Sequence, residues 1–200
     1  MSVKKNIIIA NINLIKHIGI NFYLCFKTLN NQIMKFKLVL FTLLALTNMT
    51  FGQKEAGKDV PSAMIEDLNG KKVDFKSLIE PGKVYVVSFW ATWCVPCKKE
   101  LTNMVDLAPN WKEKFNAEVI AVSTDDSRAK SKVKSYVKGE DWPYQVLLDQ
   151  NQDLMRSLGI QSIPFTLIIN KEGKIIYTHN SYVEGDEFEI ENKLISISQK

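Results

Sequence analysis

KVYVVSFWATWCVPCKKE, residues 83–100, is the stretch that decides the fold. Its first part, Lys83 to Trp90, is a continuous apolar run of the kind that forms a strand covered on both faces. Two cysteines three positions apart follow, and the pattern from Pro96 to about Ala108 is helical. Pro96 suits the first helical turn, because proline lacks the N–H group that would have no partner there. The stretch therefore predicts a strand, a short loop ending at Cys94, and a helix carrying Cys97.

Strand and helix signals alternate along the rest of the chain. The other expected strands cover residues 63–68 and 71–75 around the Asn69-Gly70 turn, 117–123, 142–148, and 165–170 and 174–178 as a second hairpin. Further helices are expected over 110–115 after a break at Pro109, from Asp126 or Ser127 to Val137, over 152–158, and from Asp186, as the N-cap, to Ile197. This alternation predicts an α/β fold with a mixed sheet flanked by helices.

The cysteines indicate redox chemistry. Cys25 lies in the N-terminal segment, so Cys94 and Cys97 are alone in the rest of the chain. Two cysteines are too few for a disulfide scaffold and only half of a four-ligand zinc site. At a helix N-terminus the unpaired N–H groups and the helix dipole favour the thiolate of Cys94, and Cys97 lies one turn further on the same face. We predict that the exposed Cys94 attacks a substrate disulfide and that Cys97 resolves the mixed disulfide.

From about Pro61 to Lys200 the chain resembles the thioredoxin superfamily, and within it the secreted TlpA/ResA-like thiol-disulfide oxidoreductases. The resemblance rests on WCVPCKKE at 93–100 and on Ser162-Ile163-Pro164. It implies a thioredoxin-like fold with an N-terminal β-hairpin, a central helix–strand insertion within 124–148, and a cis peptide bond before Pro164. A cis-proline would expose the backbone of Ile163 to an extended substrate segment, and Trp93 would extend that docking surface.

Glu100 is a third candidate catalytic residue beside the two cysteines. Small thioredoxins carry a buried aspartate at the position that Ser88 occupies here, and the resemblance suggests Glu100 as its replacement. Three positions after Cys97, its carboxyl would lie near the same helix face and could exchange a proton with that thiol. The alternative is a solvent-facing glutamate with no role.

The N-terminus has the pattern of a targeting signal. Basic residues at 35 and 37, an apolar run over 38–46 and small residues before Gln53 predict a signal peptide over 34–52. We expect a periplasmic or cell-envelope protein that is cleaved before Gln53. The apolar run is short against the ~20 residues of a membrane helix, but an uncleaved anchor is the alternative. Residues 1–33 are expected to be an over-extended reading frame, 53–60 a short tail, and 61–200 the domain.

Charge distribution argues against a nucleic-acid partner. The net charge of +4 comes from six lysines and no acid in residues 1–53, which leaves 20 basic and 22 acidic side chains in the remainder. That remainder is therefore slightly acidic, whereas a nucleic-acid-binding domain needs a basic surface.

The expected activity is reduction of protein disulfides in the cell envelope. The resemblance implies disulfide-containing substrates such as apocytochrome c, a membrane electron donor of the thiol-disulfide type, no cofactor and a monomer. Ile163 before Pro164 favours a reductase, as does the absence of histidine between the cysteines. The alternative is a copper-binding metallochaperone that uses Cys94, Cys97 and His179, although His179 is otherwise expected as a surface residue. A peroxidase is disfavoured, because Ala91 and Val87 replace the threonine and proline that precede a peroxidatic cysteine.

Overall fold

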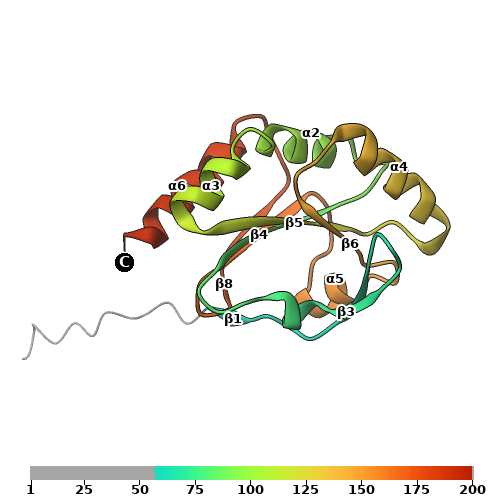
Figure 1. Ribbon diagram of the computed structural model, residues 1–200, viewed down its shortest axis with the longest axis horizontal. Coiled ribbons are helices and arrows are strands. Elements are labelled where there is room, and N and C mark those ends of the chain that lie inside the picture. The colour runs from blue at the N-terminus through green and yellow to red at the C-terminus, as the bar shows by residue number, and fades with distance from the viewer. Residues whose placement is uncertain (1–56, 200) are drawn as a thin grey trace, which may run out of the picture. The chain divides into compact units, whose positions relative to one another are not determined.

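The computed structural model describes residues 57–199, which form a mixed eight-stranded sheet with helices on both faces (Figure 1). The strand order is β1-β8-β7-β4-β5-β6-β2-β3. The strands are β1 (Lys58–Asp59), β2 (Met64–Asp67), β3 (Lys72–Asp74), β4 (Val84–Trp90), β5 (Ala117–Ser123), β6 (Gln145–Leu148), β7 (Phe165–Ile169) and β8 (Lys174–Asn180). The pairs β4–β5 and β5–β6 are parallel and the others antiparallel, so the α/β class and the mixed sheet are confirmed.

Helices cover the two faces unequally (Figure 1). One face carries α2 (Val95–Met104), α3 (Ala108–Phe115), α4 (Lys130–Glu140) and α6 (Asp186–Ser198), and the other carries α5 (Asp153–Leu158). Two short 3-10 turns, η1 (Phe75–Leu78) and η2 (Ser127–Ala129), complete the described elements.

β4 is the central strand, and all seven of its residues are buried. Val84 and Val86 pack with Trp111 of α3 on one face, whereas Val87 and Phe89 pack on the other face. A strand covered on both sides needs apolar residues at successive positions, which explains the uninterrupted run in the sequence. The cysteine loop follows the last residue of this buried strand, Trp90.

The hairpin and the insertion expected from the resemblance are both present. β2 and β3 pair around Gly70, whose φ of +87° suits glycine in a tight turn. α4 and β6 lie between β5 and α5, and β6 extends the sheet parallel to β5. Residues 58 and 59, in the segment expected as a short tail, form β1 and pair with β8.

Several element boundaries differ from those that the sequence suggests, and three of them concern residues singled out there. α2 ends at Met104, and Pro109 lies in the first turn of α3 rather than at the break, because proline is tolerated there. The strand expected from Trp142 begins at Gln145. The N-cap of α6 is Gly185 rather than Asp186, whose carboxylate instead accepts a hydrogen bond from the N–H of Val183.

The expected signal peptide at 34–52, the segment 1–33 and Cys25 lie outside the described residues. Among residues 57–199, no helix combines the length and the hydropathy that a membrane crossing requires.

Candidate active site

The cysteine pair sits where β4 passes into α2. Cys94 is the N-cap of α2, its Sγ accepts a hydrogen bond from the N–H of Cys97 at 3.3 Å, and Pro96 occupies the first helical turn. The two residues form a disulfide with their Cα atoms 5.4 Å apart. Cys97 is fully buried and Cys94 is 5% exposed. Both cysteines are therefore buried, and the prediction that Cys94 is exposed is wrong for the disulfide form, because Cys94 packs in the cluster that contains Leu101 and Ile163. Cys94 is still the more accessible residue of the two, and the helix N-terminus favours its thiolate once the disulfide is reduced.

Asp125 anchors the loop between β4 and Cys94. Its buried carboxylate accepts hydrogen bonds from the N–H and hydroxyl of Thr92, each at 2.8 Å, and from the hydroxyl of Ser123 at 2.9 Å. This contact fixes the loop two residues before Cys94. Sequence reasoning missed Asp125; the available signal was an acid two positions after the strand expected over residues 117–123.

The proline loop lies beside the cysteines. The peptide bond between Ile163 and Pro164 is cis, and Ile163 packs against the cluster of side chains that contains Cys94 and Cys97. Pro164 is buried, and its carbonyl accepts a hydrogen bond from the N–H of Ser181 at 2.9 Å. Trp93 is 68% exposed next to Cys94. The structure therefore brings together the cysteines and the residues expected to contact substrate.

Glu100 is buried, which removes the alternative of a solvent-facing residue. Its carboxyl is 1% exposed and accepts hydrogen bonds from the hydroxyl of Thr166 at 2.7 Å and from that of Ser88 at 2.9 Å. Burial raises the pKa of Glu100 to about 7, and the bonds from Thr166 and Ser88 offset part of that rise. Ser88, which stands where small thioredoxins have the buried aspartate, thus contacts Glu100, the acid that the resemblance suggests as its replacement. The hydrogen bond from Thr166 to Glu100 was not predicted from the sequence.

His179 does not approach the cysteines as a ligand would. Its side chain is half-buried rather than on the surface, and its Nε2 lies 3.0 Å from a carboxylate oxygen of Asp186. Within residues 57–199, no group of three histidine, cysteine or acidic side chains is arranged to hold a metal ion. The three-ligand site that the copper-chaperone alternative requires therefore does not form in this structure.

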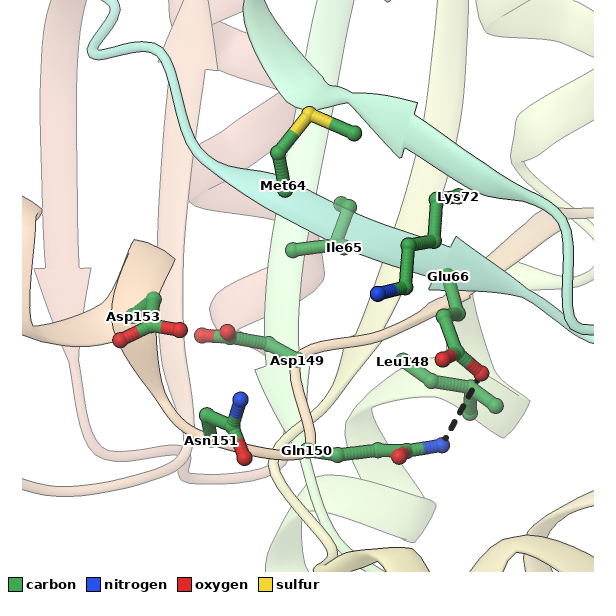
Figure 2. Close-up of a pocket in the computed structure, with 9 residues that line it drawn as sticks. All are labelled: Met64, Ile65, Glu66, Lys72, Leu148, Asp149, Gln150, Asn151 and Asp153. Carbon is green, nitrogen blue, oxygen red and sulfur yellow. Dashed lines mark hydrogen bonds between the residues drawn. The ribbon is translucent and has the colours of Figure 1, made fainter.

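A small pocket lies away from the cysteines, between the β2–β3 hairpin and the segment from Leu148 to Asp153 (Figure 2). Its acidic side chains have partners within the protein. Asp149 accepts hydrogen bonds from the N–H groups of Leu154 and Met155, and Glu66 pairs with Lys130 at 2.7 Å. These contacts hold the start of α5 and the hairpin in place, and none of the predicted site residues lines the pocket.

Comparisons with known proteins agree with this geometry. The model of the AhpC/TSA family matches residues 56–178. The thiol-disulfide oxidoreductase ResA of Bacillus thuringiensis subsp. konkukian is 37% identical over 122 residues, which cover 61% of this chain and 68% of that protein. The ResA protein of Bacillus subtilis is 34% identical over 144 residues, covering 70% and 78%.

A solved structure shows the same fold. The solution structure of an uncharacterized thioredoxin-like protein from Porphyromonas gingivalis has a TM-score of 0.63 and 35% sequence identity, covering 70% of this chain and 92% of that one. The segment matched by the family model runs from the start of the sheet into β8 and includes both cysteines, Glu100 and Pro164. This chain therefore belongs to the AhpC/TSA family and has the thioredoxin-like fold.

Proposed function

We propose that this protein is a thiol-disulfide oxidoreductase that reduces disulfide bonds of other proteins in the cell envelope. The observation that carries the proposal is the Cys94–Cys97 disulfide at the N-terminus of α2, in which Cys94 is 5% exposed and Cys97 is fully buried. The curated relatives bear the name thiol-disulfide oxidoreductase ResA, which supports this activity.

The reaction transfers two electrons from the cysteine pair to the substrate. The thiolate of Cys94 attacks one sulfur of the substrate disulfide, and the other substrate sulfur leaves as a thiolate and takes up a proton. Cys97 then loses its proton and attacks the Sγ of Cys94, which releases the second substrate thiol and leaves the Cys94–Cys97 disulfide. A thiol-disulfide donor at the membrane reduces this disulfide for the next cycle.

Exposed apolar side chains beside Cys94 support a polypeptide substrate. Trp93 is 68% and Val95 69% exposed, and Ile163 lies on the neighbouring loop. An extended segment of substrate could pair with the backbone of Ile163 while its side chains contact Trp93 and Val95. Apocytochrome c is the first such substrate to test, because its oxidised cysteines must be reduced before haem attachment.

Glu100 is proposed as the proton acceptor for Cys97. The two residues lie one turn apart on the buried side of α2, and a pKa near 7 suits a group that takes and returns a proton at neutral pH. Its role is therefore general base when Cys97 attacks and general acid when the disulfide is reduced again.

The reduction potential of the purified mature protein tests the direction of electron flow. We expect a value nearer to that of thioredoxin, about −270 mV, than to that of DsbA, about −120 mV. The protein is equilibrated with glutathione or dithiothreitol buffers, and the fraction of cysteines that can be alkylated gives the reduction potential. A potential close to that of DsbA would make the protein an oxidant and overturn the proposed direction.

Export is tested separately. We expect the protein in the cell envelope to begin near Gln53, because the basic, apolar and small residues of 34–52 fit a cleaved signal peptide. N-terminal sequencing of the envelope fraction reads the start directly. A chain that retains residues 34–52 would indicate an uncleaved anchor, and one that starts upstream of Met34 would contradict the assignment.

A further inference from the structure

A row of polar side chains crosses three adjacent strands beneath α2 and α6. Ser88 on β4 is paired in register with Thr166 on β7, and Thr166 with His179 on β8. Both pairings are antiparallel, so directly opposed side chains project from the same face of the sheet. Because Ser88 and Thr166 both bond Glu100 of α2, that face is the one α2 covers, and His179 lies on it too.

The outer end of the row is an acid–base pair. Asp186 is the first residue of α6, and one of its carboxylate oxygens lies 3.0 Å from Nε2 of His179 and accepts a hydrogen bond from the N–H of Val183 at 2.7 Å. The side chains of His179 and Asp186 are 23% and 20% exposed. The row therefore joins a buried carboxyl at Glu100 to a pair that solvent protons can reach.

We propose that His179, held by Asp186, is a positioning residue that sets the pH range in which Glu100 binds and releases its proton. Glu100 is removed from water, and its hydrogen-bond partners among the described side chains are two neutral hydroxyl groups. Charges across the row therefore act on it with little screening by solvent. Protonated His179 stabilises the Glu100 carboxylate, and the charge of Asp186 opposes it.

The two charges act with opposite sign. His179 lowers the pKa of Glu100 and Asp186 raises it. A cation near a buried carboxyl favours the ionised form, and an anion disfavours it. His179 carries this charge only when protonated. The pair thus sets how readily Glu100 holds its proton.

Other ionisable groups on the elements packed against α2 have partners of their own. Tyr182 donates to Glu187 at 2.8 Å, and Asn103 of α2 contacts both. Lys99 pairs with Glu184 at 2.6 Å, Lys98 lies over the ring of Tyr136, and Tyr144 donates to the carbonyl of Leu101. His179 and Asp186 act on the Glu100 carboxyl through charge, and Tyr182 is coupled to it as well, because the charge of Glu100 contributes to raising the pKa of Tyr182.

This inference rests on the proposed role of Glu100 in the reaction. The effect of His179 and Asp186 on the pKa of Glu100 can be measured without any turnover of substrate. The oxidised mature protein, labelled with ¹³C at glutamate carboxyl carbons, is titrated by NMR, and the Glu100 signal is assigned by its loss in Glu100→Gln. His179→Gln is expected to raise the pKa of Glu100 and Asp186→Asn to lower it. The double variant should return it towards the parent value.

Glu184→Gln is the matched control, because it removes an exposed carboxylate from the loop between β8 and α6 and should leave the Glu100 titration unchanged. Shifts of the same sign in the two single variants, or none beyond the fitting error, would overturn the inference. If His179→Gln does not fold, the Asp186→Asn variant is sufficient as a test. The inference is then overturned if this variant does not lower the pKa of Glu100. Disulfide reduction by the parent protein, assayed in parallel, shows separately whether the proposed function fails.

Discussion

Replacing Cys94 with serine is expected to abolish disulfide reduction, whereas replacing Cys97 with serine is expected to leave a protein that attacks its substrate once and stays joined to it. Serine cannot form a disulfide, so without Cys94 there is no accessible nucleophile, since Cys97 is fully buried. Without Cys97 the attack still occurs, but no second thiol resolves the mixed disulfide. Turnover of a disulfide substrate should therefore fall to background in both variants, for different reasons.

Trapped complexes distinguish the two causes. Each variant is mixed with an oxidised protein substrate, quenched with acid and an alkylating agent, and separated on a non-reducing gel. The Cys97→Ser protein should shift to the mass of a complex that dithiothreitol releases, whereas Cys94→Ser and the double variant should not. Equal trapping by the two single variants would reverse or remove the assigned roles, and turnover that survives the loss of Cys94 would exclude this disulfide as the active site.

The segment that carries the cysteines could be predicted because its signals are local. Seven consecutive buried positions in β4 and a proline in the first turn of α2 are read from neighbouring residues. The position of Cys97 on the helix then follows, because a residue three positions after the N-cap Cys94 lies one turn away on the buried side. The prediction that the loop with Pro164 lies beside the cysteines came from the family resemblance, because no local sequence pattern connects that loop to them.

The partners of the site could not be predicted, because they depend on which strands lie side by side. Thr166 follows Glu100 by 66 positions, and Asp125 follows Thr92 by 33. The strand order that brings β7 beside β4 places Thr166 opposite Ser88, and only then do both hydroxyl groups meet Glu100. The contact of His179 with Asp186 could not be predicted either, because it depends on how α6 packs. In the sequence His179 is only an isolated histidine after an expected strand.

Glu100→Gln is expected to make the protein more stable at alkaline pH. The pKa of Glu100 rises from 4.5 to about 7 on folding, chiefly because burial disfavours its charge. Between these values the folded protein holds a proton that the unfolded chain releases, so the free energy of unfolding falls as pH rises. Over the range from pH 4 to pH 8 the loss is about 3 kcal/mol. Glutamine has no proton to lose and keeps an oxygen that can accept the bond from Thr166.

Urea unfolding of the oxidised parent and the variant at pH 4, 6 and 8 measures this difference. The gap in free energy, variant minus parent, should widen by about 3 kcal/mol from pH 4 to pH 8, with most of the change between pH 4.5 and 7. Glu184→Gln, which removes an exposed carboxylate, is the control and should show no comparable trend. A gap that stays constant with pH would mean that Glu100 titrates like an ordinary glutamate.

The proposed role of Glu100 as a proton acceptor accounts for a buried acid that lowers stability at neutral pH. Glu100 lies one turn from the resolving cysteine with a pKa near the pH at which it would work. In Glu100→Gln we expect the rate of disulfide reduction to fall and its inflection near pH 7 to disappear, because Cys97 loses its proton acceptor. Rate profiles of variant and parent from pH 5 to pH 9 provide the comparison. If the stability gap widens as expected but the two rate profiles overlay, Glu100 is a structural acid, and the proton of Cys97 leaves by another route.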